Sequence, residues 1–126
     1  MAWQDIVLAS GGALGAIVSI IHGVLTQRFM VEPIDAALAR ESSIRGSIRR
    51  LNAALLHVST FAWFVGGLFV VAALWLGDEA RLVVCALVGL GYLYAAILNC
   101  WATRGRHPGW MLMSVTLVLI VVGASA

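Results

Sequence analysis

The chain contains no lysine, only two cysteines and only six acidic residues among its 126 positions. Charged residues make up 11% of the sequence and apolar residues 62%, whereas soluble domains average about 25% and about 45–50%. A chain this short cannot enclose so much apolar surface in a soluble globule, and lipid therefore has to cover it. The composition predicts an integral membrane protein that forms a single domain over residues 1–126.

The scarcity of cysteine and acid excludes several kinds of chemistry. Cys85 and Cys100 would lie about 22 Å apart on one helix, which is too far for a disulfide, and they form no CxxC pair. No apolar segment carries a carboxylate at its centre, so the buried proton carrier of small four-helix exporters is missing. The sequence contains no phosphate-binding loop and no nucleophile–base pair. It leaves open whether the protein is an enzyme.

Four apolar segments are long enough, or nearly so, to cross a bilayer. They cover residues 5–27, 51–76, 81–102 and 109–125. A spanning helix needs about 20 residues, and only the last segment is shorter than this. The predicted fold is all-α, a compact antiparallel bundle of four transmembrane helices.

The arginines predict the orientation of this bundle. Seven of the eight lie in or beside the connections 28–50 and 103–109, which four spans place on the same side. These seven are Arg28, Arg40, Arg45, Arg49, Arg50, Arg104 and Arg106. The positive-inside rule places the basic connection 28–50 in the cytoplasm and both termini outside, with only Arg81 on the outer side. We therefore expect a multi-pass protein of the cell inner membrane.

The same features suggest partners. Arginines near a bilayer attract anionic lipid headgroups by about 1 kcal/mol each, so the bilayer and its anionic lipids are expected partners. Nucleic acid is not expected, because orientation already explains the arginines. The glycine-rich first span and the short fourth span could each seat another helix, which is compatible with a homo-oligomer or a larger membrane complex.

The basic connection carries three local signals. Pro33 predicts the first turn of a short surface helix over residues 34–39, because its missing N–H has no helical partner there. Ser42 or Ser43 is the expected N-cap of the next long helix. Gly46 marks the point at which we expect that helix to bend from the membrane surface into the bilayer.

Small residues recur every four positions in the first span, at Gly11, Gly15, Ser19 and Gly23. Helices in lipid associate through close packing, and such a stripe allows two backbones to approach. His22 falls on the same stripe at about 100° per residue, so we expect it to face a neighbouring helix.

Two histidines are the strongest candidates for a functional site. Ionisable groups within a span are costly and are functional candidates by default, and only His22 and His57 qualify. Antiparallel helices would bring the two to a similar depth near the cytoplasmic face. The candidate ligand-binding cluster adds Asn99, Arg28 and Glu32.

Three interpretations of this cluster remain open. Neutral imidazoles can hydrogen-bond across helices and stabilise a non-enzymatic bundle or a component of a membrane complex. Alternatively, His22 and His57 could bind haem iron axially or hold a divalent metal ion. In the third interpretation the cluster, joined by His107 or Glu32, binds a small amphipathic molecule at the cytoplasmic interface.

The segment HGVLTQRFMVEPI, which begins at His22, resembles a family of small bacterial four-helix integral membrane proteins. In that family the first helix ends in His-Ser-x-Leu-Gly-Glu, followed by a basic, apolar run to a proline. The second helix has basic residues before a Trp-His-Leu-Thr-like step, and here Arg49 and Arg50 precede the segment LHVST around His57.

This resemblance covers about the first half of the chain and implies a fold and a histidine pair, but no activity. His22 and His57 would be the family's two intramembrane histidines, and Pro33 its loop proline. Gly23 replaces the family's serine, and Leu56 replaces its tryptophan. The family's glutamate is also replaced, which leaves Glu32 as the only nearby substitute.

Overall fold

The computed structural model describes residues 2–41 and 43–125, and every regular element in these ranges is a helix. The elements are α1 (Trp3–Thr26), η1 (Gln27–Val31), α2 (Glu32–Ala39), α3 (Gly46–Ala72), η2 (Ala73–Trp75), α4 (Asp78–Thr103) and α5 (Gly109–Ala124). Three helical stretches are long and apolar enough to cross a membrane, and α5 is shorter. The three long stretches are Trp3–Ala39, Gly46–Trp75 and Asp78–Thr103. The predicted all-α class with four main helices is confirmed.

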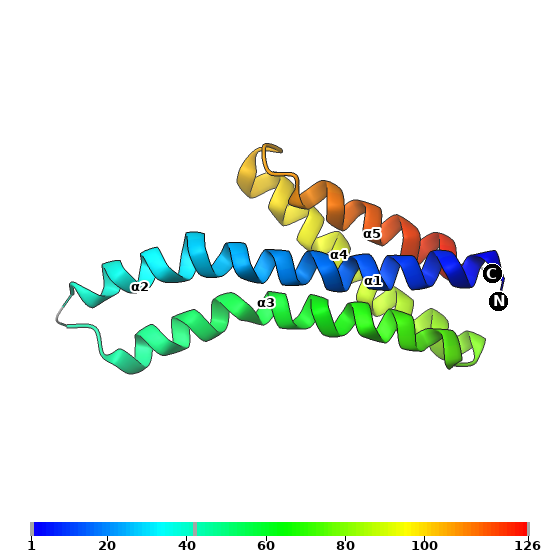
Figure 1. Cartoon of the computed structure of the whole chain (residues 1–126), viewed down its shortest axis with the longest axis horizontal. Coiled ribbons are helices and arrows are strands. Elements are labelled where there is room, and N and C mark those ends of the chain that lie inside the picture. The colour runs from blue at the N-terminus through cyan, green and yellow to red at the C-terminus, as the bar shows by residue number, and fades with distance from the viewer. Residues whose placement is uncertain (1, 42, 126) are drawn as a thin grey trace.

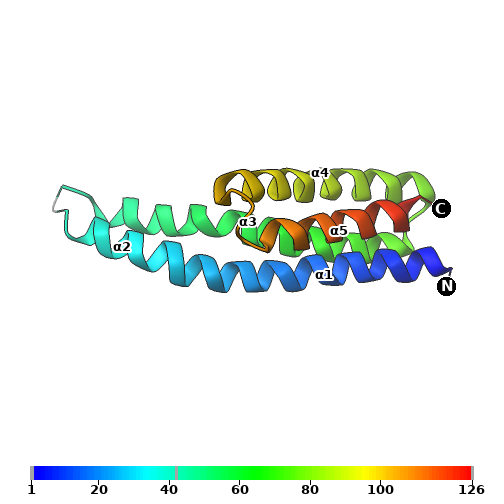
Figure 2. The ribbon, with the colours of Figure 1, turned by 90° about the horizontal axis from the view of Figure 1, so that it is seen from above.

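The main helices pack in the spatial order α3, α1, α5, α4 (Figure 1). Helix α1 makes extensive contacts with both α3 and α5, and α4 packs mainly on α5. The contact between α3 and α4 is much smaller, although these helices are neighbours in the sequence. Both chain ends lie at the same end of the bundle (Figures 1 and 2). Which end faces the cytoplasm stays a prediction.

The short helix predicted to begin at Pro33 is present as α2, with the proline in its first turn, and the helical backbone continues into it from α1 through η1. Gln27 and Glu32 both have helical dihedral angles, with φ of −56° and −61°. The segment η1 is a π-helix, in which the Glu32 N–H donates to the Gln27 carbonyl five residues earlier. This wider turn accommodates the proline ring and its missing N–H, which would disturb a regular α-helix at that point.

The start of α3 also differs from the prediction. Arg45 is the N-cap and Gly46 is the first helical residue, so Gly46 begins the helix and does not bend it. Ser43 donates a hydrogen bond to Glu41 at 3.0 Å and does not cap α3. Ser42, the alternative cap, lies outside the described residues.

Residues 27–41 and 43–50 form the two sides of a hairpin, called the arm below, that extends past the turn between α4 and α5 (Figures 1 and 2). One ion pair joins its two sides. Arg49 donates to both carboxylate oxygens of Asp35, from Nε at 2.8 Å and from a terminal nitrogen at 2.6 Å. These hydrogen bonds hold the pKa of Asp35 below its usual value, so the pair stays charged at neutral pH.

Helices α1 and α3 touch through their backbones. A Cβ atom at Gly67 would lie 2.6 Å from the Gly12 carbonyl oxygen and 2.7 Å from the Ala16 nitrogen. Further along, a Cβ at Gly23 would lie 2.7 Å from Thr60 Cγ2. We call this line of contact the α1–α3 seam.

The structure confirms the predicted packing face of α1, but the bundle itself occupies it. Gly11 lies against Leu119 and Ile120 of α5, and a Cβ at Gly15 would overlap the Tyr92 hydroxyl at 2.1 Å. The glycine face therefore seats helices of the same chain. It is not available for a second protein, contrary to the expectation from the sequence.

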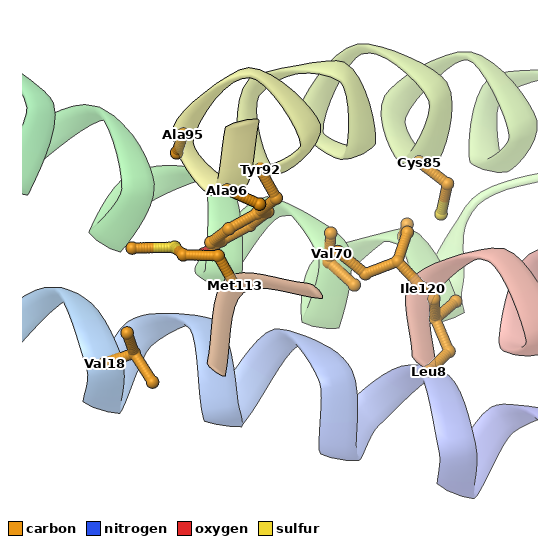
Figure 3. Close-up of a cluster of buried hydrophobic side chains, with 10 residues drawn as sticks. Leu8, Val18, Val70, Cys85, Tyr92, Ala95, Ala96, Met113 and Ile120 are labelled. Atoms are coloured by element: carbon orange, nitrogen blue, oxygen red, sulfur yellow. The ribbon is translucent and has the colours of Figure 1, made fainter. Parts of the chain in front are cut away.

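Tyr92 fills the middle of the bundle. Its side chain is 1% exposed, and its hydroxyl passes over Gly15 to donate a hydrogen bond to the Trp63 carbonyl of α3 at 2.9 Å. Figure 3 shows it in one buried cluster with Met113 of α5 and Val18 of α1. Tyr92 thus links α4 to α3, although these two helices pack only lightly.

The lone arginine on the predicted outer side is neutralised. Arg81 donates to Asp5 at 2.9 Å and to the Gly123 carbonyl at 2.8 Å. These hydrogen bonds connect the start of α4 to the start of α1 and to the end of α5.

We expect Gly67→Ala to destabilise the bundle by about 1–3 kcal/mol, because its methyl group would overlap backbone atoms that have no room to move. Gly91→Ala is the matched control, since nothing lies within 4 Å of a Cβ at that position. Thermal unfolding in detergent measures both. Equal melting temperatures for the two variants would contradict the close seam.

Candidate functional site

His22 lies in the last two turns of α1 and contacts α3. Its ring meets the Trp63 ring edge-on, with centroids 4.7 Å apart and an interplanar angle of 61°. The ring nitrogen Nε2 lies 3.2 Å from Thr26 Oγ1 and 3.5 Å from Ser59 Oγ. The prediction that His22 faces a neighbouring helix is confirmed.

His57 makes a different set of contacts from α3. Its Nε2 lies 3.0 Å from Gln27 Oε1, and because that oxygen only accepts, the histidine is the donor. The Gln27 amide nitrogen in turn donates to Glu32 at 3.4 Å. A chain of three polar side chains thus connects α3 to the arm.

The two histidines line different cavities. The His57 cavity has a volume of about 500 Å³ and is lined by Ile20, Gly23, Val24, Gln27, Arg28, Glu32, His57 and Thr60. The His22 cavity has a volume of about 370 Å³ and is lined by His22, Leu25, Thr26, Phe29, Met30, Asn99, Thr103 and His107. The predicted cluster is therefore divided, with Arg28 and Glu32 beside His57 and Asn99 beside His22.

The α1–α3 seam explains this division. At about 100° per residue, His22 on α1 and Ser59 on α3 lie on one side of the seam, and Gln27 and His57 lie on the other. Gly23 and Thr60 are packed between the two sides. A haem or metal ion held jointly by His22 and His57 would need one shared cavity, and this geometry gives each histidine its own.

The arrangement of the other potential metal ligands also bears on metal binding. Within residues 2–41 and 43–125, no group of three or more His, Cys, Asp or Glu side chains is arranged to hold a metal ion. Cys85 is buried, and both it and Cys100 are free thiols.

His107 comes from the turn between α4 and α5 and completes the polar end of the His22 cavity. The Gly109 N–H donates to His107 Nδ1 at 3.0 Å. A Cβ at position 109 would lie 2.8 Å from that nitrogen and 3.2 Å from the Asn99 amide nitrogen. Only glycine leaves room for both side chains here. The sequence suggested His107 only as one alternative, because the shape of the Pro-Gly turn decides its position.

Two buried polar atoms have no hydrogen-bond partner in the part of the chain that the structure describes, in addition to one atom of Arg81. Asn99 Oδ1 belongs to the side of the seam with His22, and Thr60 Oγ1 to the side with His57. An unsatisfied buried acceptor typically costs about 1–3 kcal/mol. Such atoms are rare in native structures and call for an explanation, of which a bound water or ligand is one.

An apolar groove adjoins the His22 cavity and shares His22, Thr26 and Met30 with it. It has a volume of about 430 Å³, and its other lining residues are Leu55, Leu56, Ser59, Trp63, Tyr94, Ala95 and Leu98. These come from α3 and α4, the pair of helices with the weak contact. Sequence reasoning missed Trp63 and Tyr94, since aromatic residues in a span are ordinarily packing or lipid-facing residues.

Comparison of the chain with protein-family models, curated proteins and solved structures finds no match. The resemblance of its first half to small four-helix membrane proteins stays a hypothesis. The function therefore has to be inferred from the helices, the arm and the two cavities.

Separate cavities predict that the two histidines act independently. The losses of unfolding free energy for His22→Ala and His57→Ala should add within about 0.5 kcal/mol, as is usual for residues without shared partners. His22→Ala and Trp63→Leu should instead show coupling of about 0.5–1.5 kcal/mol, because their rings are in contact. Unfolding titrations in mixed micelles measure both cycles, and strong coupling of the two histidines would contradict the division.

Proposed function

We propose that the protein is a non-enzymatic component of a membrane complex in the cell inner membrane, held by four spanning helices and contacting a partner protein through the arm. The observation that supports this proposal is the length of the helix that leads into the arm. The helical path Trp3–Ala39 has 37 residues, or about 55 Å, whereas the hydrocarbon core of a bilayer is about 30 Å thick. A helix that begins near one surface therefore ends well beyond the other.

The chemistry of the arm favours a protein partner. Its tip carries Arg40, about 20 Å from Gln27 along the helical path, and Arg45, the N-cap of α3. This distance exceeds twice the Debye length of about 8 Å, so attraction to lipid headgroups does not account for these two arginines. Anionic lipids are the better partners for Arg28 and Arg50, which lie nearer the apolar spans.

An exposed apolar side chain lies near the arginines of the tip. Ile48, three residues after Arg45, is 53% exposed. Arginine is enriched in protein interfaces. Apart from Arg49 and Arg81, the described arginines make no ion pair with a carboxylate, which favours an acidic partner surface.

The proposal also includes the orientation and the family. The arginine distribution places the arm in the cytoplasm and both termini outside. The resemblance around His22 and His57 supports a place among small bacterial four-helix membrane proteins. The absence of a nucleophile–base pair and of a phosphate-binding loop from the sequence supports a role without catalysis.

The orientation predicts the behaviour of reporter fusions. Alkaline phosphatase, which is active only in the periplasm, should be active when fused after Ala126 and inactive when fused after Arg40 in the arm. A reporter that is active only in the cytoplasm should show the reverse pattern. Phosphatase activity at Arg40 with none at Ala126 would refute the proposed topology.

The partner proposal predicts the particle size. The protein extracted into polymer nanodiscs without detergent should be larger than a monomer, and Arg40→Glu with Arg45→Glu should release the monomer, because both changes reverse charge at the tip. Arg104→Glu with Arg106→Glu is the matched control, on the same predicted side but outside the arm. Mass photometry distinguishes these outcomes, and a monomeric wild-type particle without a partner would refute the proposal.

A further inference from the structure

The His22 cavity and the adjoining groove share the lining residues His22, Thr26 and Met30, so that together they have a polar end and an apolar end. Asn99 and His107 line the polar end. Trp63, Tyr94 and Leu98 line the apolar end, and the two regions meet at residues shared by both, His22 among them. Phe29 and Met30 at the base of the arm also line this space, but the proposed partner contact uses the arginines at the tip of the arm, so an inference about the space stands apart from the proposed function.

The polar end offers both a donor and an acceptor. The Gly109 N–H donates a hydrogen bond to His107 Nδ1, which is therefore the acceptor nitrogen of the ring. In the neutral ring the hydrogen is then on Nε2, and this nitrogen can donate to a ligand. The Asn99 amide contributes an acceptor, since its Oδ1 has no hydrogen-bond partner within the described ranges. A hydroxyl group can meet both requirements, because it donates and accepts at the same atom.

The lining offers no counter-charge to a charged head. No Arg, Asp or Glu side chain is among the residues that line the His22 cavity or the groove in the described part of the chain. Arg28 and Glu32 line the His57 cavity, on the far side of the seam. An ionised head that enters this partly open cavity gives up part of its hydration without gaining a counter-charge, which favours an uncharged head.

The apolar end is accessible from the bilayer. Leu55 of α3 is 61% exposed and Tyr94 of α4 is 66% exposed, and both line the groove. Each volume lies within the range of about 300–1,000 Å³ that is typical of ligand pockets. An acyl chain can therefore enter sideways between α3 and α4, where the two helices pack least.

We propose that this space binds an uncharged, hydroxyl-bearing lipid with a single chain. The hydroxyl head lies at Asn99 and His107, and the chain lies along the groove against Trp63. The His22 ring separates the two environments. A monoacylglycerol represents this chemical class.

Three probes with the same chain and different heads test the proposal. Purified full-length protein in maltoside micelles is titrated with 1-monooleoylglycerol, with oleate and with methyl oleate, and bound copies are counted by native mass spectrometry. We expect one saturable copy of the monoacylglycerol per chain. Oleate, which is charged, and methyl oleate, which has no donor, should bind at least tenfold more weakly. Equal affinity for all three probes would overturn the proposal.

Variants locate the site. Asn99→Leu should weaken monoacylglycerol binding at least tenfold, while His57→Ala, on the other side of the seam, should leave it unchanged. Leu98→Trp fills the groove from a partly exposed position and should also abolish binding, which keeps the test decisive if Asn99→Leu does not fold. Undiminished binding in folded Asn99→Leu or in Leu98→Trp, or an equal loss in His57→Ala, would overturn the assignment.

Discussion

The backbone contact between Gly12 and Gly67 is the constraint on which the rest of the structure depends. Lipid gives helices no hydrophobic reason to associate, so their association depends on how closely they can pack. Two glycines facing each other bring α1 and α3 together without intervening side chains. This approach creates the seam, and the seam places His22 and His57 on opposite sides of a closed surface. The same contact that stabilises the bundle therefore divides the candidate site in two.

The remaining helices attach around this pair unevenly. Helix α5 packs on α1, and α4 packs on α5, while Tyr92 reaches across Gly15 to the α3 backbone. A single tyrosine bridges α4 and α3 where extensive helix packing is lacking. The consequence is a groove between α3 and α4 that is lined by the exposed residues Leu55 and Tyr94 and ends at His22. A fully closed four-helix bundle would have no such entry.

Sequence reasoning succeeded where the signal is an average over many residues and failed where it depends on one. The apolar segments located the four helices, and the small-residue stripe located the packing face of α1. Pro33 begins a short helix as predicted, but the sequence did not indicate that the π-helical turn Gln27–Val31 joins this helix to α1. Gly46 and Ser43 were assigned roles that the neighbouring backbone does not give them.

The sequence by itself determined the all-α class, the membrane character and the candidate polar residues, because composition and helical periodicity are properties of the chain alone. Only the tertiary structure decided which of these residues meet. Periodicity places His57 on a face of α3, but it does not say how α3 is rotated against α1. The contact of Gly67 with Gly12 and of Thr60 with Gly23 sets that rotation. It thereby places His57 beside Gln27 and leaves His22 with Ser59 and Trp63, in a cavity shared with Asn99.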